Sequence, residues 1–125
     1  MVTRALFDVV KVDFAPADRT ANELLAVIPV YTGDIILGAY HIPVVLSSTS
    51  NTVSLGHTGD VARFTASYDT SGGTVNTPID GQTAAMPRTI LADQNLNVDY
   101  VAVGGGGTTV PRVRFVVTIL RAPRF

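Results

Sequence analysis

The sequence predicts an all-β protein: an antiparallel β-sandwich, or jelly-roll-like fold, of seven or eight strands. Apolar and polar residues alternate along several segments, most clearly over residues 112–121, as expected for strands with one buried face. Clusters of Gly, Pro, Asn, Asp and Ser separate these segments and are typical of turns. Because no segment carries a convincing helical pattern, the strands have to bury their apolar faces against other strands.

The expected strands follow these alternating and β-branched runs. In chain order they cover residues 5–14, 19–31, 35–46, 51–55, 89–92, 96–103 and 112–121. In the last two strands, the residues that we expect to share a core face include Leu96, Val98, Tyr100, Val113, Phe115, Val117 and Ile119.

Residues 51–64 combine a strand with a tight turn. Val53 and Leu55 lie on one face of the strand, and a Gly-x-x-Gly-Asp turn over 56–60 follows it. The turn leads to Arg63 and Phe64, which we expect to anchor the next segment. This stretch is the centre of the predicted architecture, with long apolar strands before it and a polar excursion after it.

Three segments leave alternatives open. Thr20 and Glu23 match a helix capping box, but Pro29 and the β-branched run around it favour a strand over 19–31. Gly38 and Pro43 inside the strand at 35–46 predict a bulge, a bend or an edge position. Residues 65–88 lack periodicity, and a structureless loop of that length is unusual, so we expect short strands there or contact with a partner.

Length and composition indicate one domain over residues 1–125, with residues 1–5 and 122–125 as arms. Charged residues make up 15% of the chain, whereas soluble domains average about 25%. No apolar run reaches the roughly 18 residues of a membrane span, and residues 1–5 do not begin a secretory signal. A soluble chain so short of charge is expected to bury part of its outer surface in an assembly.

The same composition excludes several functions. A net charge of −1 disfavours nucleic-acid binding, and the absence of cysteine excludes disulfides and thiolate metal sites. His41 and His57 are the only histidines, too few for a zinc or cupin-like iron site without further ligands, and the aspartates lack the spacing of an EF-hand. Ser54, His57 and Asp60 share one turn but no nucleophile elbow. We therefore expect no catalytic residues, no cofactor and no metal.

Four segments, residues 27–37, 53–64, 96–100 and 113–120, follow one another in a characteristic order. This order of parts resembles a family of small β-sandwich proteins that decorate or cement the heads of tailed bacteriophages. The resemblance covers roughly residues 22–121 and rests on loose motifs, with His57 and Thr58 departing from the Gly- and Asp-rich turn of that family. It implies a virion protein, assembled in the host cytoplasm, that binds the major capsid protein at the capsid surface as a homo-oligomer, preferably a trimer.

Candidate interface residues lie near the C-terminus. Four arginines without an intervening acid fall in the last fourteen residues, and they could contact an acidic strip on a capsid subunit or protect a sheet edge. The glycine run at 104–107 lacks the Lys-Ser/Thr of a phosphate loop and predicts a mobile hairpin tip or a finger that orders on the shell. The candidates are Arg112, Arg114, Arg121, Arg124, Gly105 and Gly106.

The sequence thus predicts a capsid decoration or cement protein and no enzyme. The alternative, from another class, is a carbohydrate- or receptor-binding sandwich of a phage fibre. Sugar sites usually present exposed aromatic side chains, but the chain has no tryptophan, and Tyr68 is the only tyrosine that we expect in a loop.

Overall fold

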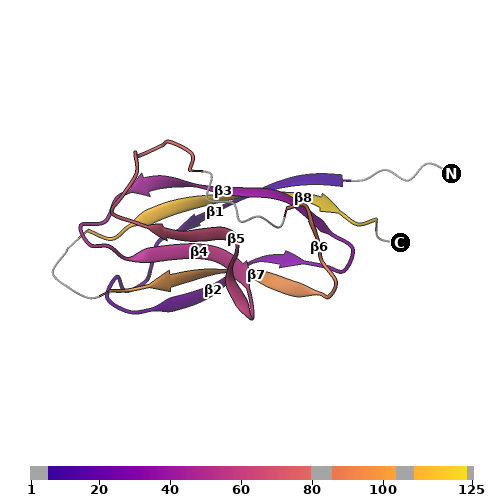
Figure 1. The fold of residues 1–125 in the computed structure, drawn as a ribbon, viewed down its shortest axis with the longest axis horizontal. Helices are drawn as coiled ribbons and strands as arrows, with labels where there is room; N and C mark the ends of the chain where they lie inside the picture. The colour runs from indigo at the N-terminus through magenta and orange to yellow at the C-terminus, as the bar shows by residue number, and fades with distance from the viewer. Residues whose placement is uncertain (1–5, 80–85, 104–108, 124–125) are drawn as a thin grey trace.

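The computed structural model describes residues 6–79, 86–103 and 109–123, and these form eight strands in two antiparallel sheets that pack as a sandwich (Figure 1). The predicted fold class is therefore confirmed. The strands are β1 (Leu6–Phe14), β2 (Glu23–Val30), β3 (Ile35–Val45), β4 (Thr52–His57), β5 (Asp60–Asp69), β6 (Arg88–Thr89), β7 (Gln94–Val101) and β8 (Arg112–Arg121).

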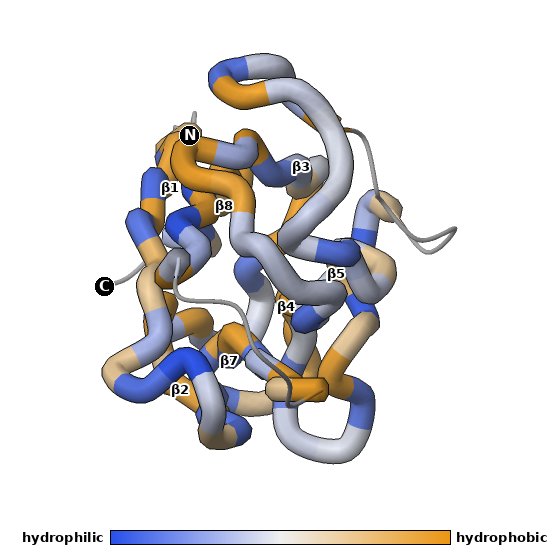
Figure 2. The backbone as a smooth tube through the Cα atoms, turned by 90° about the vertical axis from the view of Figure 1, so that its left-hand side faces the viewer, coloured by the Kyte–Doolittle hydropathy of each residue, from blue (hydrophilic) through white to orange (hydrophobic). Residues whose placement is uncertain are grey.

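The connectivity is that of a jelly roll. One sheet has the order β1-β8-β3-β6 and the other has the order β2-β7-β4-β5. Only the β4–β5 hairpin joins consecutive strands within one sheet, and every other connection crosses between sheets. Figure 2 shows the two layers nearly end-on, with β1, β8 and β3 in the upper layer and β2 and β7 in the lower one.

The core lies between the sheets because the inward residues of both are apolar. The predicted core faces of β7 and β8 are confirmed: none of their seven expected core residues is more than 1% exposed. In antiparallel sheets, paired residues share a face, so the partners of Phe115 are also inward. These partners are Val12 on β1 and His41 on β3.

The segment at 19–31 contains a strand, as the β-branched run around Pro29 predicted. β2 begins at Glu23 and pairs only with β7, so it is an edge strand, where a proline without an N–H is tolerated. A register shift between Ala26 and Ile28 marks a bulge. β3 shows shifts at Ile36/Gly38 and Pro43/Val45, which confirms the irregularity expected from its glycine and proline.

The segment over 65–88 contains strand residues, as the first of its two alternatives expected. Residues 65–69 belong to the ten-residue strand β5, which begins at Asp60, and Arg88 begins β6. Register shifts between β4 and β5 place the adjacent Phe64 and Thr65 both inside, and this breaks the alternation by which a strand is recognised. The strand expected at 89–92 shrinks to Arg88–Thr89, because Ile90 instead bonds the Gly33–Asp34 turn, to which it donates at 2.7 Å and from which it accepts at 2.8 Å.

Candidate interaction surface

The outer face of the β1-β8-β3 sheet is largely apolar. The strand register arranges its outward side chains in four rows across β1, β8 and β3. Only three of the twelve positions carry a charged side chain, and several apolar ones are well exposed, among them Phe7 at 64% and Val9 at 57%. The rows are Phe7–Leu120–Ile35, Val9–Thr118–Gly38, Lys11–Val116–Tyr40 and Asp13–Arg114–Ile42.

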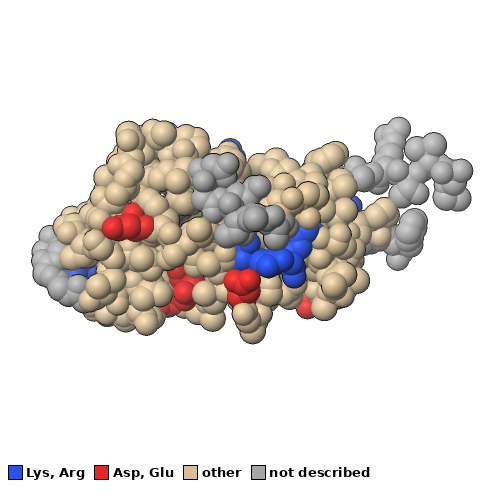
Figure 3. All heavy atoms as spheres, viewed as in Figure 1, with Lys and Arg blue, Asp and Glu red and all other residues tan. Residues whose placement is uncertain are grey.

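The outer face of the other sheet is different. Its outward positions on β7 and β4 are mostly polar: Asn95, Asn97, Asp99, Thr52 and Ser54. Both faces belong to antiparallel sheets, one side of which is usually solvated and polar. The second face matches that expectation in its polar composition, although Ser54 and Asn97 on it are buried. The apolar face of β1-β8-β3 has more apolar surface than solvent contact alone explains. Figure 3 draws the surface in the view of Figure 1, and the side that faces the viewer is mostly uncharged, with small patches of acidic and basic side chains.

Arg114 and Asp13 form a two-point ion pair within the apolar face. Nε of Arg114 donates to Oδ1 of Asp13 at 2.7 Å, and Nη2 donates to Oδ2 at 3.3 Å. The hydrogen bond from Arg114 lowers the pKa of Asp13, and the same bond raises the pKa of Arg114. Both groups are solvent-exposed, so the pair orients the side chains more than it stabilises the fold. Arg112 lies two residues away on the same face and is exposed.

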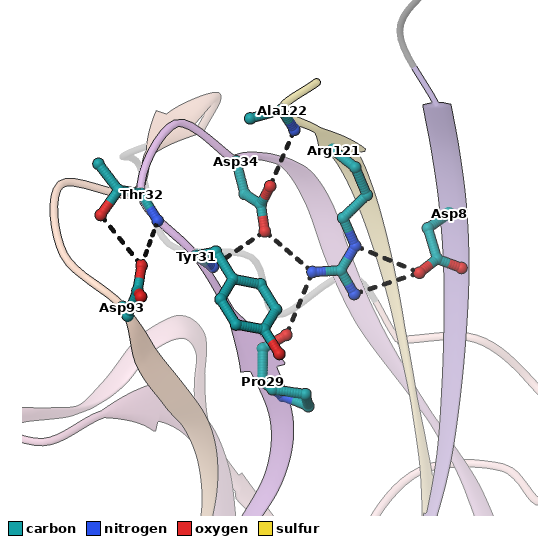
Figure 4. A network of polar contacts seen from close by, with 8 residues as sticks. All are labelled: Asp8, Pro29, Tyr31, Thr32, Asp34, Asp93, Arg121 and Ala122. Atoms are coloured by element: carbon teal, nitrogen blue, oxygen red, sulfur yellow. Dashed lines mark hydrogen bonds and ion pairs between the residues drawn. The ribbon is translucent and has the colours of Figure 1, made fainter. Parts of the chain in front are cut away.

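Arg121, at the other end of β8 from Arg112, binds polar groups of its own chain (Figure 4). Its Nη1 donates to Oδ2 of Asp34 at 2.9 Å and to the carbonyl of Pro29 at 3.1 Å. Its Nη2 donates to Asp8 on β1 at 3.1 Å. The guanidinium therefore ties β1 and β8 of one sheet to the β2–β3 connection, and it has few donors left for another molecule.

Asp34 is the buried centre of this network. Its side chain is fully buried and accepts from the backbone N–H groups of Tyr31 and Ala122, each at 2.9 Å, as well as from Arg121. Burial pushes the pKa of Asp34 upward, but the hydrogen bonds from Ala122, Tyr31 and Arg121 outweigh it and hold the pKa below its ordinary value. Asp34 is thus a charged structural group. No sequence motif indicated it, because two of its three partners, Arg121 and Ala122, lie 87 and 88 positions away along the chain.

The structure therefore separates the predicted arginines. Arg112 and Arg114 lie on the apolar face at the start of β8, while Arg121 serves the fold at its end. Arg124, Gly105 and Gly106 lie outside the described residues. Among the described candidates, Arg112 and Arg114 remain the basic groups available to a partner.

The residues considered for chemistry have other partners. Ser54 Oγ donates to the carbonyl of Val61 at 2.8 Å, the His57 ring contacts the carbonyl of Thr58, and Asp60 faces Arg63 at 3.8 Å. Within residues 6–79, 86–103 and 109–123, no group of three or more His, Asp or Glu side chains could hold a metal ion. The same residues contain no helix long and apolar enough to cross a membrane.

Two aromatic positions are structural. Tyr68, which we expected in a loop as a possible sugar platform, lies in β5, is 9% exposed and donates its hydroxyl to the carbonyl of Gly72. His41 is buried, with its ring centroid 4.4 Å from that of Tyr68 and 6.1 Å from that of Phe115. Burial lowers the pKa of His41 to about 4, so the ring is neutral at pH 7.

The fold is similar to that of chains in two solved bacteriophage capsids. The similarity to a chain of the cyanophage Pam1 capsid asymmetric unit has a TM-score of 0.60 at 20% identity, and covers 94% of this chain and 85% of that chain. A chain of the acidic stable capsid of the Helicobacter pylori bacteriophage KHP30 gives a TM-score of 0.66 at 13% identity, covering 96% and 92%. The chain shares its fold with these two chains. Neither protein-family models nor curated protein sequences give a match.

Proposed function

We propose that the protein is a structural component of a bacteriophage virion that attaches to the head shell as a decoration or cement protein. The observation that carries the proposal is the apolar outer face of the β1-β8-β3 sheet, on a fold similar to chains of two phage capsids. A surface with Phe7 at 64% exposure and Val9 at 57% gains free energy when another protein covers it. The partner is the major capsid protein, and the location is the outer surface of the virion.

The proposed mechanism is mechanical. Each copy bridges neighbouring shell subunits, and the buried apolar area contributes about 25 cal/mol per Å² at each contact. A modest contact repeated over a whole shell sums to a large resistance against internal pressure. Arg112 and Arg114 lie at one end of the face, where they add electrostatic attraction to an acidic strip on the shell. The trimeric state belongs to the same proposal and rests on the resemblance to head decoration proteins.

Co-sedimentation with emptied phage shells tests the proposal. The purified protein should pellet with the shells in a saturable way and raise the temperature at which they break. Tyr40→Asp places a charge in the third row of the apolar face, and Arg112→Glu reverses an exposed charge beside it; each should reduce occupancy on shells. Arg112 is preferred to Arg114, since a glutamate at 114 would also face Asp13.

A matched control separates attachment from folding. Arg19→Glu makes the same charge reversal in the β1–β2 connection, where the carbonyl of Arg19 accepts from Tyr100 of the other sheet, and should leave occupancy unchanged. Full occupancy of the Tyr40→Asp and Arg112→Glu variants would show that this face does not attach to the shell. Binding to a glycan array without any binding to shells would favour the fibre alternative instead.

A further inference from the structure

The two edges of the β1-β8-β3-β6 sheet differ in how they are covered. On the β3 side, β6 pairs with Ile35 and Ile36. Residues 76–79 cover the next part of the same edge. There the N–H of Ile79 donates to His41 O at 2.8 Å, and the N–H of Asn76 donates to Pro43 O at 2.8 Å. On the opposite side, β1 pairs only with β8, and no other described strand lies against it.

β1 lacks several of the features that usually protect an edge strand, although it carries three charged side chains, Asp8, Lys11 and Asp13. Natural edges are kept from pairing by bulges, prolines, short length or several charged side chains. β1 is nine residues long, contains no proline and keeps one register with β8 from Leu6 to Phe14. Its inward residues Val10 and Val12 are only half-buried, although they pack against the core. The edge is therefore a regular backbone template with uncovered apolar side chains beside it.

The second sheet exposes apolar residues on the same side of the molecule. Figure 2 shows β1 above β2 on the left-hand side of both layers. Leu24 on β2 is 58% exposed and Leu25 is 44% exposed, although Leu25 pairs with the inward Val98. The ring of Phe14 lies 6.0 Å from that of Tyr100, which pairs with Glu23, so the start of β2 lies opposite the end of β1. Both layers thus expose apolar side chains on this side of the molecule.

We propose that in solution two copies of this chain associate through the edge of β1 that faces away from β8, with the strands antiparallel about a twofold axis at Val12, a contact distinct from the trimer proposed on the shell. In such a pair, directly opposite residues point to the same face of the sheet. Inward residues therefore lie opposite inward residues only if the twofold axis passes through a residue and not between two residues. An axis at Asp8 or at Lys11 places that residue opposite its own copy, which sets like charges side by side. An axis at Val12 places Lys11 of each copy opposite Asp13 of the other.

With the axis at Val12, the β2-β7-β4-β5 sheet also contributes apolar side chains to the contact between the two copies. It faces residues 10–14 of the two strands against each other and brings together the ends at which Leu24 and Leu25 are exposed. The half-buried Val10 and Val12 then gain cover from the second sandwich. Axes at Val9 and Val10 place Lys11 opposite Phe7 or Val9, so they form no opposite-charge pair. A second copy fits because the charge pattern of β1 complements itself.

Charge reversal on β1 tests this contact in solution, without shells. Lys11→Asp sets two aspartates opposite each other at both contacts, and Asp13→Lys does the same with lysines. Each variant should weaken self-association by about tenfold or more, because two favourable cross-strand pairs become two repulsive ones. An equimolar mixture of the two variants restores opposite charges at both contacts and should form heterodimers at the affinity of the parent.

Sedimentation equilibrium of the parent, the two variants and their mixture gives the readout, and differently tagged variants identify the heterodimer. Asp99→Lys, on the polar face of the other sheet, is the matched control and should associate as the parent does. Circular dichroism checks that Asp13→Lys keeps its fold after losing Arg114 as a partner. A monomeric parent, an assembly indifferent to both variants, or a mixture that fails to associate would each overturn the contact. The result does not depend on whether the protein binds a shell.

Discussion

Arg121 and Asp34 form an ion pair at 2.9 Å in which the carboxylate is fully buried and the guanidinium is 16% exposed. Arg121 ends β8 and Asp34 immediately precedes β3, so the pair joins neighbouring strands of one sheet at their ends. Through Pro29 O and Asp8, the same guanidinium also reaches β2 and β1. A buried pair of this kind holds its geometry because separating the two groups would leave a buried charge without a counter-charge, which lowers the stability of the fold.

Asp34→Asn should lower the free energy of unfolding by about 2–4 kcal/mol. Arg121 then loses its buried counter-charge, and one oxygen acceptor becomes an amide N–H donor. Urea unfolding at pH 7 measures the change. Asp93→Asn is the matched control: Asp93 accepts from Thr32 in a solvent-exposed turn, so its substitution should cost less than about 1 kcal/mol. Equal costs for the two variants would contradict the role given to Asp34.

His41 should make the fold sensitive to mild acid. Its folded pKa is about 4, below the ordinary 6.5, so the unfolded chain binds a proton first as the pH falls. Stability from this residue is full above pH 6.5, decreases between pH 6.5 and about 4, and stops decreasing below that. The expected loss across the window is about 3 kcal/mol, since each unit of pKa difference corresponds to about 1.4 kcal/mol.

His41→Phe removes the titrating group and keeps an aromatic ring beside Tyr68 and Phe115. Urea unfolding of parent and variant at intervals from pH 7 to pH 4 should show a flatter dependence for the variant. His57→Phe gives the comparison, because the His57 ring contacts the backbone carbonyl of Thr58 at a turn rather than lying in the core. An unchanged slope in the His41 variant would assign the acid sensitivity to other groups.

Phe115→Ala should destabilise the protein by about 3–5 kcal/mol, because the ring is 0% exposed on a central strand and its removal leaves a cavity. Phe7→Ala removes the same ring from the solvent side of β1, where the side chain is 64% exposed, and should change stability by less than about 1 kcal/mol. Thermal unfolding at low protein concentration measures both. A melting temperature of Phe115→Ala close to that of the parent would mean that the ring carries little of the core.

Gly56→Ala should also destabilise the fold, by about 1–3 kcal/mol. A Cβ at Gly56 would overlap the backbone of Asp60 and Val61, where β5 crosses close to β4, and backbone atoms cannot move aside as a flexible side chain can. Gly72→Ala is the control, since a Cβ there would make only an ordinary contact of 3.6 Å with Asp69 O. Similar melting temperatures for the two variants would contradict the close approach at Gly56.

The sequence was informative where a local pattern was intact. Alternation fixed the inward residues of β7 and β8, and Pro29 with its β-branched neighbours predicted the strand at β2. It failed at β5, because bulges bury the adjacent Phe64 and Thr65 and so remove the period of two. It also grouped Arg121 with Arg112 and Arg114, although opposite ends of a ten-residue strand have different surroundings.

By itself, the sequence determined the fold class, the core faces of the regular strands and a shortage of charge, because these depend on composition and on neighbours a few residues apart. Only the tertiary structure decided that the apolar excess gathers on one outer face and that, among the described strands, β8 alone pairs with β1. It also decided that Arg121 meets Asp8 across 113 positions and Asp34 across 87. Such contacts arise from the order of strands in the sheets, which no local pattern specifies.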